Sequence, residues 1–309
     1  MDRSFENCPR IAQIFIEKVI RNWPEWVDAG NIINIFVNAI LAVTATLGNG
    51  MIIVAILRSQ NLQTPSYLLI STLAFADLLV GLMIHPLHIV GGTFFLQGNL
   101  RGLCAMASLY IFFGLFLGSV SVMIVTCISI DRYLALTLRH RYTIIVTKKR
   151  VRLLIIFVLI LAFLGAFSNI FEKYFVIFSR AMFSCYVALL LTTCVFYIKS
   201  FRALHLYTVQ VQVHAQQPNP LVFNFDVVRY KKTLQTMLVV LVCLLLCYVP
   251  SICVFSMRKM LDNRKGELVV YFTSITLICL NSSINPIIYL IRFADIRSAC
   301  HQSFRNLLH

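Results

Sequence analysis

Residues 103–133 read LCAMASLYIFFGLFLGSVSVMIVTCISIDRY, a mostly apolar stretch that ends in Asp131-Arg132-Tyr133. About 20 consecutive apolar residues are enough for a helix to cross the hydrocarbon core of a bilayer. The stretch therefore predicts a membrane-spanning helix with an acid and a base at one end. An ionised side chain at that depth costs roughly 2.5–3.5 kcal/mol on insertion scales, so the pair indicates a function.

Six more stretches of this kind occur along the 309 residues, of which 59% are hydrophobic and 13% charged. The seven predicted spans cover residues 32–57, 66–90, 103–130, 153–171, 175–198, 234–257 and 268–291. Between them there is no room for a second domain. We predict an all-α membrane protein, a seven-transmembrane helix bundle over residues 32–291. An extracellular segment, 1–31, precedes the bundle, and a cytoplasmic segment, 292–309, follows it.

The net charge of +15 is distributed unevenly between the two sides of the predicted bundle. If the N-terminus lies outside, the inner segments carry 16 of the 27 Lys and Arg residues against three acids, Asp131, Asp226 and Asp295. Cytoplasmic segments of membrane proteins are enriched in bases in this way, and the bases suit anionic lipid. We expect a multi-pass plasma-membrane protein with an extracellular N-terminus, whose partner is the lipid bilayer and not nucleic acid.

The last span contains Asn281-Ser282-Ser283-Ile284-Asn285-Pro286-Ile287-Ile288-Tyr289. Asn281 and Asn285 are four residues apart and share a helix face. Pro286 loosens the helix because it removes a backbone hydrogen bond. Packing alone explains this concentration of polar residues poorly.

Single residues mark three other spans. Asn49 in the first span must find a partner inside the bundle, and packing explains it as well as function does. Asp77 in the second span is a lone carboxylate, either protonated or paired with a cation. Pro250 in the sixth span predicts a kink, which either acts as a pivot or has no special consequence.

Residues 293–308 place apolar side chains at spacings of three or four against Arg297 and Arg305. This pattern predicts a short amphipathic helix on the inner leaflet, with Cys300 as a palmitoylation candidate. The ten cysteines show no metal or redox spacing. Only Cys8 and Cys104 look plainly extracellular, and they form a candidate disulfide pair.

Asn49, Asp77, the 131–133 triplet, Pro250 and the 281–289 motif, in this order, resemble the rhodopsin-like (class A) G protein-coupled receptors. The resemblance covers nearly the whole chain. It implies a receptor and not an enzyme: an extracellular ligand binds, and outward swing of the sixth helix activates a heterotrimeric G protein. The residues that match the family's coupling and activation positions are Asp131, Arg132, Tyr133, Tyr197, Tyr248, Pro250, Asn285, Pro286 and Tyr289.

The resemblance also implies an allosteric sodium ion and no other cofactor. The matching residues are Asp77, Ser121, Asn281 and Asn285. A carboxylate, a hydroxyl and two amides suit a hard cation. The charge of the ion would keep Asp77 ionised, and its binding would favour the inactive state.

Three features that are common in this receptor family are missing here, and their absence indicates which group of the family the chain resembles. The position of the usual third-helix cysteine is Ala107, and Cys104 lies one turn too early. The usual fifth-helix proline is Leu189, and almost no outer loop separates the fourth and fifth spans. In these features the chain is closest in architecture to the melanocortin receptors, within the group that also holds the adenosine, cannabinoid and lysophospholipid receptors.

The ligand is less constrained. Gly114 stands where amine receptors carry an aspartate, so a monoamine is not expected. The acidic pocket residues of the melanocortin receptors are missing too, which leaves a lipid, a nucleoside-like molecule or a peptide. The ligand candidates near the outer mouth are His85, His88, Tyr110, Glu172, Lys173 and Arg180. For both histidines, hydrogen bonding within the bundle is an equal alternative.

Two departures concern activation. Tyr230 replaces the acid that often restrains the arginine from the sixth helix, which predicts basal activity. Arg139-His140 stand where the family commonly places proline and a bulky apolar residue. A receptor-like scaffold with impaired coupling is therefore one alternative. A small membrane transporter is another, but it would need an ionisable relay at the midplane, where this chain has essentially Asp77 alone.

Overall fold

The computed structural model describes residues 26–138, 141–168, 175–214, 232, 234–236, 238–253 and 267–308. Its helices are α2 (Trp26–Arg58), η2 (Gln60–Leu62), α3 (Pro65–Leu79), η3 (Val80–Ile84), α4 (His85–Leu96), α5 (Leu100–Leu138), α6 (Tyr142–Ile145), α7 (Lys148–Ser168), α8 (Phe175–His214), α10 (Glu267–Arg292) and α11 (Ala294–Leu308). A further helical span, Leu234–Cys253, lies between α8 and α10. These helices confirm the all-α fold class.

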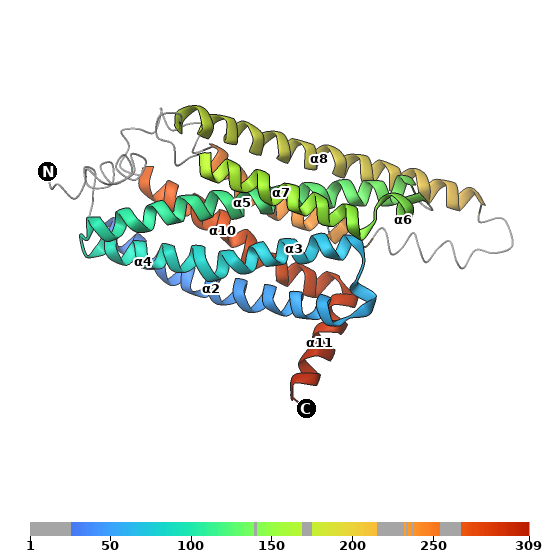
Figure 1. Ribbon diagram of the computed structural model, residues 1–309, viewed down its shortest axis with the longest axis horizontal. Helices are drawn as coiled ribbons and strands as arrows, with labels where there is room; N and C mark the ends of the chain where they lie inside the picture. Colours follow the sequence, from blue (N-terminus) through green and yellow to red (C-terminus); the bar gives the residue numbers. More distant parts are fainter. Residues whose placement is uncertain are drawn as a thin grey trace.

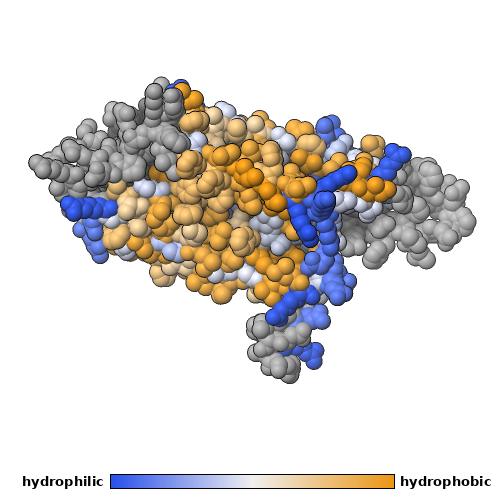
Figure 2. Space-filling view, viewed as in Figure 1, coloured by the Kyte–Doolittle hydropathy of each residue, from blue (hydrophilic) through white to orange (hydrophobic). Residues whose placement is uncertain are grey.

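Seven helices in the described residues are long and apolar enough to cross a membrane. They lie side by side with their long axes roughly aligned (Figure 1). Arg58, Leu138 and Arg292 therefore lie at one end of the bundle, which we call the Arg132 end, and the start of α2 lies at the other, the Trp26 end. Apolar residues cover much of the visible surface between the ends (Figure 2). Phe36 and Leu246, for example, are 68% and 66% exposed, as suits a lipid-facing surface.

The helices extend beyond the spans predicted from hydropathy. The third predicted span ended at residue 130 and the fifth at 198, whereas α5 continues to Leu138 and α8 to His214. Hydropathy marks the apolar core of the bilayer, but backbone hydrogen bonding continues the helix into water. The charged triplet of α5 is thus held on a rigid helix rather than on a loop.

The second span is not one regular helix. Thr64 caps α3, with Pro65 in the first turn, and the short π-helix η3 separates α3 from α4 just before Pro86. Proline has no N–H to donate to the preceding turn. Asp77 and His85, one on each side of η3, are both fully buried. π-Helical turns often lie near functional residues, and hydropathy gave no sign of this one.

The centre of the bundle is α5, which packs against α3, α4, α7 and α8. Large side chains such as Leu73, Ile124 and Tyr289 are buried between the helices. Small residues permit close approach: a Cβ atom added to Gly48 would lie 2.7 Å from Pro286 Cγ. The helices α2 and α10 therefore pack closely where the last span carries its proline.

The amphipathic helix predicted over 293–308 is confirmed as α11. It leaves the bundle at a steep angle at the Arg132 end (Figure 1). Ile296, Ala299 and Cys300 are buried, whereas Arg297 and Arg305 are exposed. The Cys300 thiol faces the Met51 carbonyl oxygen at 4.0 Å. Palmitoylation of Cys300 would therefore require α11 to move from α2, a constraint that the sequence did not reveal.

Candidate functional site

At the Arg132 end, hydrogen bonds converge on the carboxylate of Asp131, which is 5% exposed. Its Oδ2 atom accepts from Ser66 Oγ at 2.9 Å and from the Arg132 guanidinium, which also donates to Ser66. Its Oδ1 atom accepts from the Tyr142 hydroxyl at 2.6 Å. Asp131 thus holds Arg132 aside, with help from Ser66 of α3 and Tyr142 of α6.

Tyr142 lies outside the membrane-spanning helices. Burial, together with the negative charge of Asp131 and the hydrogen bond to it, raises the pKa of Tyr142 to about 12. The phenol therefore remains protonated and donates at neutral pH. The sequence did not indicate a role for Ser66 or Tyr142. Ser66 is merely the first residue of the second predicted span, and Tyr142 lies between the third and fourth predicted spans.

The other predicted activation residues lie on α5, α8, the sixth span and α10. The Tyr197 hydroxyl of α8 donates to the Leu234 carbonyl oxygen and so connects α8 to the sixth span. Tyr133 packs edge-on against Phe196, with ring centroids 5.6 Å apart. Tyr248 and Tyr289 are buried, Pro250 belongs to the sixth span, and Pro286 lies inside α10. Arg139, His140 and Tyr230 lie outside the described residues.

In the middle of the bundle, Asp77 is fully buried. Among the described residues it accepts hydrogen bonds from Ser282 Oγ and Asn285 Nδ2, both at 2.7 Å. Ser121 and Asn281 are buried as well, at 3% and 2% exposure. The sequence identified Asn285 but not Ser282, although Ser282 lies between Asn281 and Asn285 in the same motif.

Asn285 Oδ1, and Asn281 Oδ1 one helix turn before it in α10, are buried without a hydrogen-bond partner in the part of the chain that the structure describes. A buried acceptor without a donor is costly, and an ordered water or a bound ion is one way to satisfy it. Carboxylate and amide oxygens are ligands that hard cations prefer. The donor set around Asp77 therefore fits a small hard cation.

Asn49 faces the bundle, as predicted. It is fully buried, and its Nδ2 atom donates to the Ala45 carbonyl oxygen at 2.9 Å and to the Ser282 carbonyl oxygen at 3.0 Å. The second bond connects α2 to the helix turn that also carries the Ser282 hydroxyl. Asn49 thus helps to position Ser282, which in turn bonds Asp77. Its role in helix packing and its contribution to the site are therefore compatible.

Near the Trp26 end, three of the predicted ligand candidates lie together. His85 Nδ1 is 2.8 Å from Asn38 Oδ1, and His88 Nε2 is 3.0 Å from Asn34 Nδ2. His88 also packs edge-on against Tyr110, with ring centroids 5.5 Å apart. Hydrogen bonding within the bundle, the alternative interpretation of the histidines, is thus present.

The remaining ligand candidates do not join this group. Arg180 is exposed on α8, and Glu172 and Lys173 lie outside the described residues. Sequence reasoning missed Asn34 and Asn38. Their spacing with Asn31, at intervals of three and four, was a signal for one polar face of the first helix.

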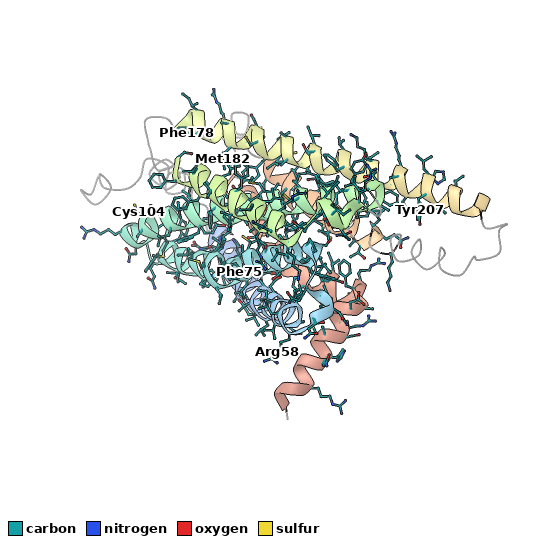
Figure 3. All side chains as sticks on the ribbon, turned by 45° about the vertical axis from the view of Figure 1, so that its right-hand side comes forward. Arg58, Phe75, Cys104, Phe178, Met182 and Tyr207 are labelled. Atoms are coloured by element: carbon teal, nitrogen blue, oxygen red, sulfur yellow. The ribbon has the colours of Figure 1, made fainter. Side chains whose placement is uncertain are left out.

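Cys104 is disulfide-bonded, and the eight other described cysteines are free. It lies at the end of the bundle where α5 begins, away from Tyr207 near the far end of α8 (Figure 3). Cys8, the predicted partner, is outside the described residues. The pairing stays a prediction.

The sequence of this chain is similar to those of known membrane receptors. The model of the family described as 7 transmembrane receptor (rhodopsin family) matches residues 48–289. The adenosine receptor A3 of Ovis aries is 25% identical over 283 residues, which cover 82% of this chain and 84% of that protein. The histamine H2 receptor of Cavia porcellus is 23% identical over 290 residues, covering 86% and 77%.

A third relative, the octopamine receptor beta-1R of Drosophila melanogaster, is 22% identical over 315 aligned positions, covering 88% of this chain and 61% of that protein. The family match runs from Gly48, beside Asn49, to Tyr289, so it includes the Asp77 and Asp131 clusters. The chain belongs to the rhodopsin family of seven-transmembrane, G protein-coupled receptors.

Proposed function

We propose that this receptor activates a heterotrimeric G protein when the sixth helix swings outward and Arg132 leaves Asp131. The observation that carries this proposal is the cluster of Asp131, Arg132, Ser66 and Tyr142 at the Arg132 end. Among the described residues, every partner of the carboxylate is a side chain, so movement of α3 or α6 relative to α5 changes the restraint on Arg132. The extracellular N-terminus and the cytoplasmic Arg132 end belong to the same proposal, on the strength of the charge distribution.

Tyr197 supplies the second part of the mechanism. Its hydroxyl donates to a backbone carbonyl of the sixth span, a neutral hydrogen bond worth about 0.5–1.5 kcal/mol. Tyr230 offers no carboxylate to pair with Arg132. The neutral bond from Tyr197 restrains the sixth span less than a charged pair between that span and Arg132 would, which supports basal activity.

Within the bundle, Asp77, Ser121, Asn281 and Asn285 would hold a sodium ion. The two unpartnered amide oxygens support this assignment. A bound cation supplies positive charge that stabilises the ionised form of Asp77 in a low-dielectric interior. Preferential binding to the closed bundle would favour the inactive state.

The ligand we propose is a lipid, a nucleoside-like molecule or a peptide that enters near His88 and Tyr110. Two of the relatives are named for histamine and octopamine, but Gly114 offers no carboxylate to an ammonium group. A Cβ atom at Gly114 would meet no heavy atom of the described residues within 4 Å. The short outer connection after the fourth span and Leu189 in place of proline favour a melanocortin-like architecture, and a Cys8–Cys104 disulfide belongs to this proposal.

The test is a G-protein activation assay without ligand, comparing the wild-type receptor with Arg132→Ala at equal surface expression. Loss of the guanidinium removes the group that meets the G protein, so we expect the wild type to signal above the variant for at least one G-protein subtype. Arg152→Ala, which removes the same group at an exposed position of α7, serves as the matched control and should retain the signal. Equal signals from the wild type and Arg132→Ala would contradict basal activity.

A further inference from the structure

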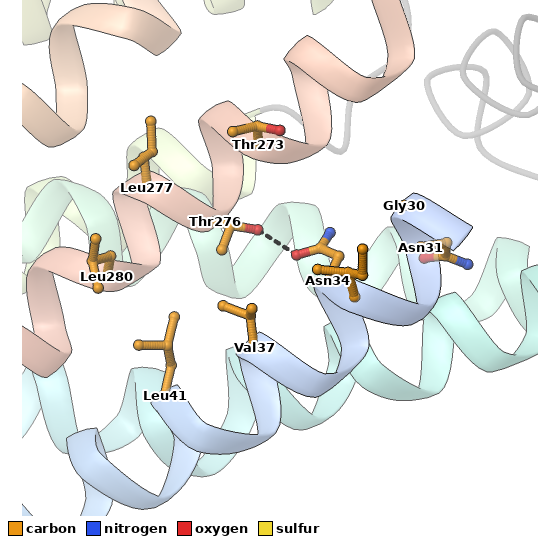
Figure 4. Close-up of a pocket in the computed structure, with 10 residues that line it drawn as sticks. Gly30, Asn31, Asn34, Val37, Leu41, Thr273, Thr276, Leu277 and Leu280 are labelled. Carbon is orange, nitrogen blue, oxygen red and sulfur yellow. Dashed lines mark hydrogen bonds between the residues drawn. The ribbon is translucent and has the colours of Figure 1, made fainter. Parts of the chain in front are cut away.

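A crevice of about 320 Å³ lies between α2 and α10 near the Trp26 end. Its volume falls within the range of small-molecule sites, about 300–1,000 Å³. Figure 4 shows side chains of both helices around this space, with Val37 and Leu41 on α2 and Leu277 and Leu280 on α10. Ile33, which also lines it, is 64% exposed on the bundle surface, so the crevice is open toward the bilayer.

Polarity changes along the crevice. The part nearest the Trp26 end carries the amide of Asn34 and the hydroxyls of Thr273 and Thr276, whereas the deeper part is aliphatic. Such a gradient matches a molecule with a polar head near the membrane surface and a hydrocarbon chain below it. In the described part of the chain, none of the lining residues is charged. A charged head group would therefore lose its water without gaining a counter-charge.

One hydrogen bond crosses the crevice and connects it to the interior. Thr276 Oγ1 donates to Asn34 Oδ1 at 2.7 Å (Figure 4). The same oxygen accepts from Asn38 Nδ2 at 2.8 Å, while Asn34 Nδ2 contacts His88 Nε2 at 3.0 Å. A molecule that competes for Thr276 therefore changes the hydrogen bonding of Asn34, and through it that of His88.

At its interior end, this series of hydrogen bonds reaches a histidine that can make one more hydrogen bond. Asn38 bonds His85 Nδ1, and His85 is fully buried with no described partner for its Nε2 atom. A rearrangement of Asn34 and Asn38 is thus transmitted to two histidines that face the bundle interior. Passive contact with bilayer lipid would not require such a connection.

We propose that the crevice between α2 and α10 binds an uncharged, single-chain lipid with a hydroxyl-bearing head group, taken up from the adjacent leaflet. Its hydroxyls bond Thr276 and Asn34, and its acyl chain packs along Val37 and Leu277. The binding itself does not depend on G-protein coupling.

The experiment uses the full-length receptor in lipid nanodiscs and a monoacylglycerol probe that carries a photoactivatable group and an alkyne in its acyl chain. We expect labelling of peptides within residues 26–58 and 267–292, and competition by the unmodified monoacylglycerol. Val37→Trp, which fills the crevice, should abolish labelling. Ile40→Trp is the matched control, because Ile40 is an exposed residue of the same helix that does not line the crevice, and it should be labelled like the wild type.

Thr276→Val tests the head group, because it removes the hydroxyl and keeps the shape of the side chain. Competition by the monoacylglycerol should weaken about two- to tenfold, as expected for one neutral hydrogen bond. Leu277→Trp fills the crevice from α10 and should also abolish labelling, so the test does not depend on correct folding of Val37→Trp alone. Thermal unfolding of each variant is measured in parallel.

Undiminished labelling of both tryptophan variants would overturn the site. Equal competition by the fatty acid of the same chain length would overturn the uncharged head group, and stronger competition by cholesterol would overturn the acyl chain. Labelling that follows the expected pattern in a receptor without G-protein activation would contradict only the proposed function. Loss of labelling with G-protein activation intact would contradict only the lipid site.

Discussion

Buried polar side chains in this receptor are bonded across helices that are distant in sequence. Asp131 and Ser66 are 65 residues apart, and Asp77 and Asn285 are 208 apart. The sequence identified Asp131, Asp77 and Asn285 from their positions in the predicted spans. The sequence did not identify the hydroxyl-bearing partners Ser66, Ser282 and Tyr142. A lone hydroxyl gives no sequence signal, because its importance depends on a carboxylate that only the fold brings near it.

At Asp77 the first prediction concerns sodium. Replacing Asp77 with Asn removes the charge that would attract the ion, so the variant should lose stabilisation by sodium. A ligand at ten times its Kd stabilises a folded protein by about 1.4 kcal/mol. The measurement is thermal unfolding of the purified receptor in sodium chloride and in choline chloride of equal ionic strength.

Asp295→Asn is the matched control for that measurement, because it makes the same change of charge at an exposed position of α11. It should keep the sodium response of the wild type. A full sodium response in Asp77→Asn would show that the cluster around Asp77 does not hold the ion.

At the scale of elements, the packing of α2 against α10 depends on one glycine. A Cβ atom at Gly48 would lie 2.7 and 2.8 Å from two ring carbons of Pro286, which cannot rotate away because they belong to a ring. We expect Gly48→Ala to separate the helices and to destabilise the receptor by about 1–3 kcal/mol, as overpacking does. Thermal unfolding and surface expression measure the effect.

Gly50→Ala tests the same chemistry two residues further along α2. There the added Cβ atom would meet only Leu78 Cδ1, at 4.0 Å, which is ordinary van der Waals contact. This variant should unfold at or slightly above the wild-type temperature, since alanine favours a helix more than glycine does. If both variants unfold alike, the contact with Pro286 does not limit the packing.

At the level of single elements, the sequence predicted where the helices lie better than it predicted their lengths, their local geometry and their packing. Each apolar stretch became a helix, and the 293–308 pattern became α11, because burial in lipid requires internal backbone hydrogen bonds. The extension of α5 to Leu138, the π-turn before Pro86 and the burial of Cys300 were not predictable in this way. They depend on local hydrogen bonding and on tertiary contacts, which a hydropathy window does not measure.

For the whole molecule, the distribution of charge supports the proposed orientation, with the N-terminus outside. Basic residues concentrate in the segments at the Arg132 end, where Arg58, Arg150 and Arg297 are exposed. The translocation machinery retains such segments in the cytoplasm. The crevice between α2 and α10 would then open to the outer leaflet, and the Asp131 cluster would face the G protein.

The orientation is tested with an epitope tag placed before residue 1 or after residue 309. Antibody should stain intact cells that express the N-terminal tag and should stain the C-terminal tag only after permeabilisation, because α11 follows an odd number of crossings. A cytosolic protein with the same tag checks that the plasma membrane is closed. Staining of the C-terminal tag on intact cells would place the Arg132 end outside, where Arg132 has no access to a G protein, and would thereby overturn the proposed coupling mechanism together with the orientation.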